Sequence, residues 1–124
     1  MKIRILDNSI RLRLSQTEVQ HLSEKGKVEA QTQFGLAPNA SLIYSLEKKE
    51  TPAIHAAFSD NRIQIFLPNQ MATDWATSDE VGLEDDMPLG DGNALHILVE
   101  KDFKCLTERS EDESDLFPNP NENC

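Results

Sequence analysis

The sequence lacks several features that would identify a class of protein at once. It contains only two cysteines, Cys105 and Cys124, among 124 residues, which is too few for a disulfide framework. It has no apolar run of about 18 residues, so no membrane-spanning helix is expected. The first residues do not form the apolar stretch of a signal peptide. We therefore expect a cytoplasmic protein, in which both thiols stay reduced.

Basic residues are scarce. There are 12 Lys and Arg residues against 22 Asp and Glu residues, which gives a net charge of −10, and this charge disfavours binding to nucleic acid or to an anionic membrane. Residues 1–78 contain 9 basic and 8 acidic residues, whereas residues 79–124 contain 3 and 14. The length and this division predict one domain, residues 1–103, followed by an acidic extension, residues 104–124.

Motifs that would indicate catalysis or a metal site are also missing. The sequence contains no Ser/His/Asp spacing, no glycine loop for phosphate and no Cys-x-x-Cys pair. His96, Cys105, Glu111, Asp112 and Cys124 do not follow the spacing of a closed zinc site. The sequence therefore predicts no catalytic residue, no metal and no cofactor, and it favours a protein that is not an enzyme.

The clearest pattern that is present lies in residues 2–14, where apolar and basic residues alternate on both sides of Asp7-Asn8. This alternation predicts a two-stranded hairpin, and a two-residue loop, in which Asn8 tolerates a positive φ, gives the register. Lys2 then lies opposite Arg13 and Arg4 opposite Arg11, all on one face. Because opposed like charges destabilise a ladder, we expect anions to neutralise this face.

The rest of the chain predicts the element order ββαββ twice. A capping box, Ser15 to Glu18, begins the first helix, which ends before Gly26. The second half again begins with a hairpin at an Asp-Asn pair, Asp60-Asn61, 53 positions after the first, and internal duplication and chance similarity both remain open. The further expected elements are strands at 28–34, 41–47, 53–58, 62–67, 81–87 and 94–103, and a helix at 69–77.

These elements predict an α+β fold with a mostly antiparallel sheet of about eight strands and two short helices. The helices should bury Val19 with Leu22, and Met71 with Trp75, on the apolar face of the strands. Two arrangements remain open. In a closed barrel with the helices outside, the basic face points into the lumen, whereas in a sheet curled around the helices it points into solvent.

The barrel arrangement resembles the triphosphate-tunnel (CYTH) superfamily over roughly residues 1–103. That resemblance implies binding or hydrolysis of phosphorylated compounds through charged tunnel residues and a divalent metal. The superfamily's first strand carries a Glu-x-Glu-x-Lys signature, whereas this chain has Lys2-Ile3-Arg4-Ile5-Leu6. The resemblance therefore supports anion binding more than metal-dependent hydrolysis.

The whole chain is also similar to a family of small uncharacterised bacterial proteins, a domain of unknown function. The similarity lies at both ends of the chain. It covers Met1-Lys2-Ile3-Arg4 with residues 8–14, then residues 99–106, the acidic run and Phe117-Pro118-Asn119-Pro120. This resemblance implies no particular activity.

Three functions follow from these observations. The first is binding of an anionic, phosphate-bearing small ligand by Lys2, Arg4, Arg11 and Arg13. The second is a non-catalytic interaction module, in which that face is an internal salt-bridge network and the acidic region meets a basic protein partner. The third is a phosphohydrolase that would use carboxylates from the set Glu47, Glu84, Asp86 and Glu100. Leu116 and Phe117, just past the acidic run, are expected to pack on the domain. The sequence does not predict an oligomeric state.

Overall fold

The computed structural model describes residues 1–104, 115 and 117. In these residues the chain forms eight strands and two helices in the expected order ββαββ twice. The strands are β1 (Lys2–Leu6), β2 (Ser9–Leu14), β3 (Lys27–Gln33), β4 (Ser41–Lys49), β5 (His55–Ser59), β6 (Arg62–Pro68), β7 (Gly82–Pro88) and β8 (Ala94–Lys101). The helices are α1 (Gln16–Lys25) and α2 (Asn69–Ala76). The α+β class is therefore confirmed.

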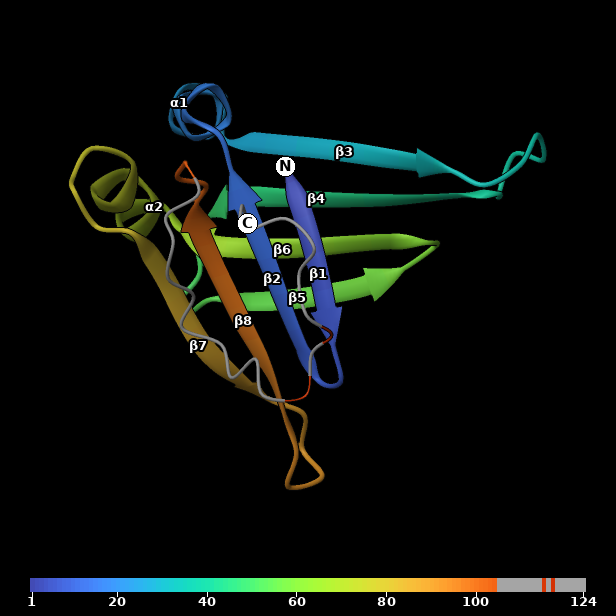
Figure 1. Cartoon of the computed structure of the whole chain (residues 1–124). Helices are drawn as coiled ribbons and strands as arrows, with labels where there is room; N and C mark the ends of the chain where they lie inside the picture. Colours follow the sequence, from blue (N-terminus) through green and yellow to red (C-terminus); the bar gives the residue numbers. More distant parts are fainter. Residues whose placement is uncertain (105–114, 116, 118–124) are drawn as a thin grey trace.

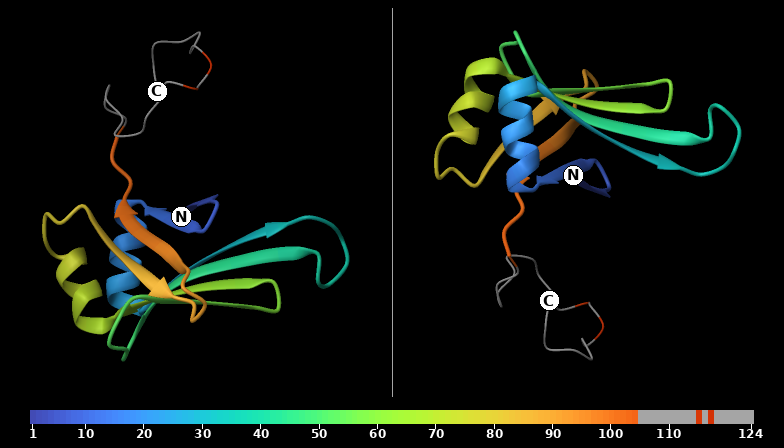
Figure 2. Two further views of the ribbon diagram at one scale, coloured as in Figure 1. Left: turned by 90° about the horizontal axis from the view of Figure 1, so that it is seen from below. Right: turned by 90° about the horizontal axis from the view of Figure 1, so that it is seen from above.

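The strands form two separate four-stranded sheets (Figure 1). Sheet A has the order β1-β2-β8-β7, and sheet B has the order β3-β4-β6-β5. The sheets face each other across one core, with both helices at the same end of the molecule (Figure 2). The closed barrel is therefore wrong for the described residues, and so is a single curved sheet.

Each sheet combines a hairpin from the first half of the chain with a hairpin from the second half. The two hairpins of a sheet join through a parallel pair, β2 with β8 in sheet A and β4 with β6 in sheet B. Leu12 pairs with Val99, and Ile65 pairs with Leu46. Ile65 follows Leu12 by 53 positions, and Val99 follows Leu46 by 53 positions. This equal spacing supports an internal duplication, and the parallel pairs make both sheets mixed.

The register predicted for the first hairpin is confirmed. Lys2 pairs with Arg13 and Arg4 with Arg11. The turn differs in one respect, because Asp7 rather than Asn8 has the positive φ, at 48°. Aspartate, like asparagine, tolerates this region because its short polar side chain can bond locally, so either residue of the pair can make the turn.

Each helix buries one row of side chains in the core between the sheets. The capping box at Ser15 and Glu18 is present, and Gly26 ends α1 in the left-handed conformation, as expected. In α2 the buried residues are Ala72 and Trp75, whereas Met71 is exposed, so its expected burial is wrong. Ala72 and Trp75 lie 53 positions after the buried Val19 and Leu22 of α1. The small Ala72 lets the helix approach the sheet, while Trp75 fills the space and donates its indole N–H to the Val81 carbonyl at 3.2 Å.

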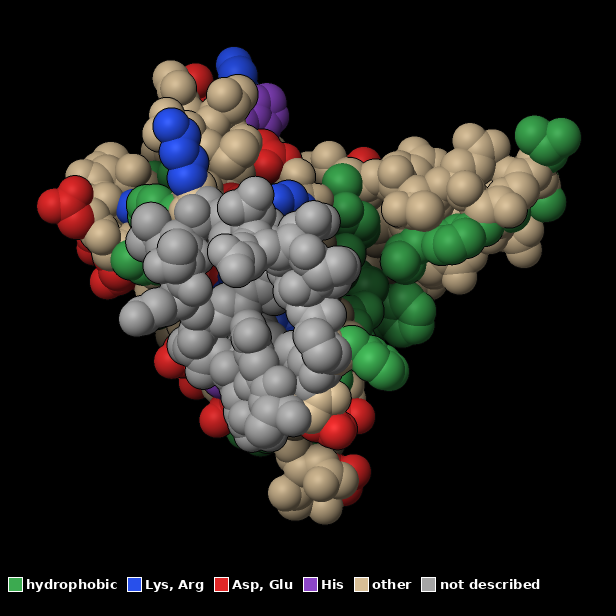
Figure 3. Space-filling model, viewed as in Figure 1, with side chains coloured by type: hydrophobic (Ala, Val, Ile, Leu, Met, Phe, Trp, Pro, Cys, Tyr) green, Lys and Arg blue, Asp and Glu red, His purple; other side chains and the backbone are tan. Residues whose placement is uncertain are grey.

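The hairpin β3–β4 extends beyond sheet A at the end of the molecule away from the helices (Figures 1 and 2). Phe34 was expected within the third strand, but that strand ends at Gln33 and Phe34 is exposed, as are Leu36 and Phe58. Hydrophobic side chains gather along this part of the surface (Figure 3). Sheet B runs past the edge of sheet A here (Figure 1), so sheet A does not cover this part of sheet B.

Two further expectations concern the end of the chain and the membrane. Phe117 is 97% exposed, so its expected packing on the domain is wrong, and Leu116 lies outside the described residues, as do Cys105 and Cys124. Neither helix in the described part of the chain has the length and apolar character needed to cross a membrane.

Trp75→Ala should lower the free energy of unfolding by about 3–5 kcal/mol, because it removes the largest fully buried side chain and leaves a cavity. Met71→Ala is the matched control on the same helix, and its effect should be well below half of that because Met71 is exposed. Urea denaturation followed by circular dichroism measures both variants. Equal losses would contradict the burial pattern of α2.

Candidate functional site

The four predicted cations lie together on the outer face of β1 and β2, and we call Lys2, Arg4, Arg11 and Arg13 the basic strip. Ile10, Leu12 and Leu14 of β2 are buried toward the core. Because successive side chains of a strand point to opposite faces, Arg11 and Arg13 must face away from the core. The prediction that the four cations share one face is therefore confirmed, and their placement in a barrel lumen is wrong.

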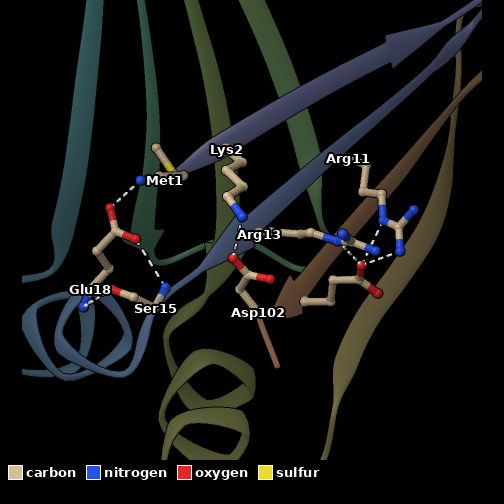
Figure 4. A network of polar contacts seen from close by, with 8 residues as sticks. Met1, Lys2, Arg11, Arg13, Ser15, Glu18 and Asp102 are labelled. Carbon is tan, nitrogen blue, oxygen red and sulfur yellow. Dashed lines mark hydrogen bonds and ion pairs between the residues drawn. The ribbon is translucent and has the colours of Figure 1, made fainter. Parts of the chain in front are cut away.

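One carboxylate, Glu100 of β8, organises two arginines of the strip. The Nε atoms of Arg11 and Arg13 donate to the same Glu100 Oε1, at 2.6 and 2.7 Å, and Arg11 adds a contact from its terminal nitrogen to this oxygen. The side chains of Arg11 and Arg13 point toward one another (Figure 4). The Glu100 side chain is only 14% exposed. A single negative charge therefore orders two guanidinium groups.

Lys2 pairs with a second carboxylate, Asp102, which follows β8. Their atoms Nζ and Oδ2 are 2.9 Å apart, although the Lys2 side chain is 73% exposed. The hydrogen bond from Lys2 lowers the pKa of Asp102 and outweighs burial, which raises it, and the charges of Lys2 and Arg13 lower this pKa further. Arg4 is also engaged in an interaction. Lys2 thus pairs with Asp102, and Arg11 and Arg13 pair with Glu100.

The equivalent position of sheet B carries a carboxylate without the arginines. Glu47 lies 53 positions before Glu100, and Gln64 lies 53 positions after Arg11. Glu47 accepts hydrogen bonds from the Ser45 hydroxyl at 2.9 Å and from the Gln64 amide at 3.0 Å. The two halves therefore carry the acceptor at equivalent positions, while Gln64 and Phe66 stand in sheet B where sheet A has Arg11 and Arg13.

The other candidate carboxylates have partners of their own. Glu84 and Asp86 of β7 lie beside His96 of β8, whose Nδ1 is 2.7 Å from Asp86 Oδ1 and whose Nε2 is 3.2 Å from Glu84 Oε2. The hydrogen bond to Asp86 raises the pKa of His96 and outweighs burial, which lowers it, and the charges of Asp86 and Glu84 raise this pKa further. Of the four carboxylates proposed for a phosphohydrolase, Glu100 contacts Arg11 and Arg13 of the strip, whereas Glu84 and Asp86 pair with His96.

Metal binding finds no support in the described residues. Nowhere in residues 1–104, 115 and 117 do three His, Cys, Asp or Glu side chains gather so that they could hold a metal ion. Cys105, Glu111, Asp112 and Cys124, which the sequence analysis considered with His96, lie outside the described residues.

Glu100 was one of four carboxylates that the sequence offered as candidates to lie beside the strip, but it was not singled out as the shared counter-ion of Arg11 and Arg13. Its position opposite Arg13 follows from the parallel pairing of β2 with β8, and a sequence pattern does not specify which distant strands pair. The sequence did contain one signal. Glu47 and Glu100 are 53 positions apart, and the same spacing separates the two hairpin turns at Asp7-Asn8 and Asp60-Asn61.

Comparison with known proteins gives a family but no activity. The chain belongs to a family of unknown function, DUF7009, whose model matches residues 1–121. The resemblance noted at both ends of the sequence is therefore confirmed. No curated protein and no solved structure matches the chain. The resemblance to the triphosphate-tunnel superfamily is not confirmed.

Glu100→Gln should lower the free energy of unfolding by about 1.5–3 kcal/mol, because it removes the charge that two guanidinium groups share. Glu47→Gln is the matched control, since its partners in the other sheet are neutral, and its loss should be about 1 kcal/mol or less. Urea denaturation at low and high salt measures both, and the Glu100→Gln loss should shrink with salt. Equal, salt-independent losses would show that the charge of Glu100 does not matter.

His96 should make stability depend on pH. Its pKa is raised above 6.5 in the folded protein, so protonation stabilises the fold fully below the unfolded pKa, and this contribution disappears as pH rises through the folded pKa. The stability of the wild type relative to His96→Gln should therefore fall between about pH 5.5 and pH 8.5, where histidine titrates. Denaturation curves across that range test this, and a constant difference would refute it.

Proposed function

We propose that this protein binds an anionic, phosphate-bearing small molecule on the basic strip of sheet A. The observation that carries the proposal is the shared carboxylate, because Glu100 Oε1 accepts from the Nε of both Arg11 and Arg13. Two guanidinium groups held by one fixed acceptor are ordered before any ligand arrives. Such preorganisation reduces the entropy that binding would otherwise cost.

The chemistry of the strip suits phosphate. Guanidinium groups present several N–H donors in a planar fork, which matches phosphate and carboxylate oxygens. The strip gathers four cations on one face of a hairpin. This occurs in a chain whose net charge is −10. A local positive surface on an acidic protein is a feature that binding of an anion would explain.

A second candidate is the interaction module, and the pair Lys2–Asp102 favours it. If the contacts of Lys2, Arg11 and Arg13 with Asp102 and Glu100 serve only the fold, the strip is a structural network and the acidic region meets a basic protein partner. The phosphohydrolase gains no support, because Glu47, Glu84 and Asp86 lie elsewhere.

The setting of the proposed function follows from charge and composition. The net charge of −10 disfavours nucleic acid and anionic membranes as partners. We propose a cytoplasmic setting, because two cysteines among 124 residues are too few for a disulfide framework. The binding unit is the domain of residues 1–103, with residues 104–124 as its acidic extension.

Phosphate, pyrophosphate and tripolyphosphate should raise the melting temperature of the protein at constant ionic strength, in that order. A ligand that binds only the folded state stabilises it according to its occupancy. The gain should shrink with added salt, because the attraction is screened. Differential scanning fluorimetry measures the effect, with chloride as the reference anion.

Arg4→Ala combined with Arg13→Ala should abolish the gain. The matched control is Lys27→Ala combined with Arg62→Ala, which removes two cations that share Glu29 on the other sheet, and it should leave the gain intact. If polyanions act on the wild type no more than chloride does, the ligand proposal fails and the structural network stands.

A further inference from the structure

The inward face of sheet B is buried near the helices and becomes exposed toward the opposite end of the molecule (Figure 2). Val28 of β3 is only 7% exposed, whereas Phe34, six positions later and therefore on the same face, is 73% exposed. The backbone N–H of Phe34 still donates to the Ala40 carbonyl, at 2.6 Å, so the alternation continues past the last pair of the ladder. The neighbouring hairpin shows the same change, because Ile65 is fully buried while Phe58 is 71% exposed.

We call the exposed part of this surface the open patch. Its most exposed apolar members are Ile5, Phe34, Leu36 and Phe58. Ile5 belongs to sheet A, where it lies opposite the buried Ile10 in the ladder and so faces sheet B. Behind these residues, half-buried side chains continue the same face of sheet B: Ala30, Leu42, Tyr44, Ala56 and Ile63. Hydrophobic side chains gather over this part of the surface (Figure 3).

The area of the open patch is that of a protein interface. An aromatic side chain offers about 150–250 Å², so Phe34 and Phe58 together present about 200–350 Å² in each copy of the chain. A specific interface buries about 1,200–2,000 Å² in total, and the four phenylalanines of two copies would supply roughly a third of it. Ile5, Leu36 and the half-buried residues of the patch can supply the remainder.

The charge of the chain favours this surface for contact between copies. Each copy carries a net charge of −10, so two copies repel each other over most of their surfaces. The side chains of the open patch are uncharged, including that of the exposed Thr32. Two patches can therefore meet without placing like charges opposite each other. A strongly charged partner would gain nothing from a neutral apolar surface.

The packing inside the chain shows what this kind of face accepts. The buried part of the inward face of sheet B packs against sheet A across one core, and sheet A is built from equivalent positions of the duplicated unit. Ile5 and Phe58, for example, are 53 positions apart, and so are their ladder partners Ile10 and Ile63. One repeat unit thus already packs its apolar face on the other. The open patch continues that face beyond the edge of sheet A.

We infer that two copies of this chain form a dimer by packing their open patches together about a two-fold axis. Such an axis brings the same patch of both copies into contact, and the two extended β3–β4 hairpins stack face to face at the usual spacing of packed sheets, about 10 Å. The second copy then occupies the space beside sheet A that sheet A itself leaves open. The inference goes beyond the proposed function and does not depend on it, because the basic strip lies on the outer face of sheet A.

The test variant combines Phe34→Glu with Leu36→Glu. Both residues follow the end of β3 and are exposed, so the fold does not need their apolar side chains. The matched control combines Val81→Glu with Leu89→Glu, which are exposed apolar residues on either side of β7. Leu89 lies 53 positions after Leu36. Both variants gain the same negative charge, so their comparison separates the patch from net charge.

Sedimentation equilibrium of the full-length chain at micromolar to submillimolar concentrations measures the association. The wild type and the control should dimerise with a dissociation constant in the micromolar range or lower, as interfaces of this size do. In the test variant this constant should rise at least about a hundredfold, because two anchors are lost from each copy and like charges oppose each other. A monomeric wild type, a dimer that survives in the test variant, or equal losses in both variants would overturn the inference.

Two measurements on the wild type need no variant. Added salt should strengthen the dimer, because it screens the repulsion between two acidic copies, whereas a dimer that dissociates in salt would be held by charged groups and would contradict the inference. Isotope-filtered NMR on a mixture of labelled and unlabelled chains should give contacts between copies from the rings of Phe34 and Phe58. Contacts between copies from other surfaces instead would also overturn it.

Discussion

The parallel pairing of β2 with β8, and of β4 with β6, is the constraint on which the rest of this structure depends. Each half of the chain supplies two hairpins, and neither hairpin of a half pairs with the other. The sheets exist because hairpins from different halves meet through these parallel ladders. The core follows from this exchange, since Leu12, Val99, Leu46 and Ile65 lie on the paired central strands and are almost fully buried.

The same pairing creates the candidate site. Lys2, Arg4, Arg11 and Arg13 come from one hairpin, and that hairpin alone would place like charges opposite each other without relief. β8 brings Glu100 beside Arg13, and the residue after the strand end, Asp102, reaches Lys2. The corresponding position in sheet B, Glu47, is satisfied by neutral partners. The basic strip is thus a specialisation of one sheet on a scaffold that both halves share.

Local features of the fold could be predicted from the sequence, whereas long-range features could not. The register of the first hairpin, the capping box at Ser15 and the stop at Gly26 follow from spacing and turn chemistry within a few residues. The expectation that Met71 is buried was wrong, and Ala72 is buried instead. Periodicity in an eight-residue helix defines the buried face only to within one position. The division into two sheets, and with it the contact of Glu100 with Arg11, depends on pairing between strands about 90 residues apart. No periodicity in the sequence encodes that choice.

The position of β8 has a consequence for how the chain reaches this structure. β8 is the last strand in the sequence, yet it lies in the middle of sheet A, between β2 and β7. During synthesis the first hairpin therefore cannot pair with β8 until nearly the whole domain has left the ribosome. Until then, the apolar face of the hairpin, which carries Ile10 and Leu12, lacks the neighbouring face of β8. Contacts between such distant segments slow folding, because the entropy of closing a long loop is lost before the contacts form. Sheet A can be completed only after translation of the domain, and the apolar face of the first hairpin is the surface that a chaperone would meet in the meantime.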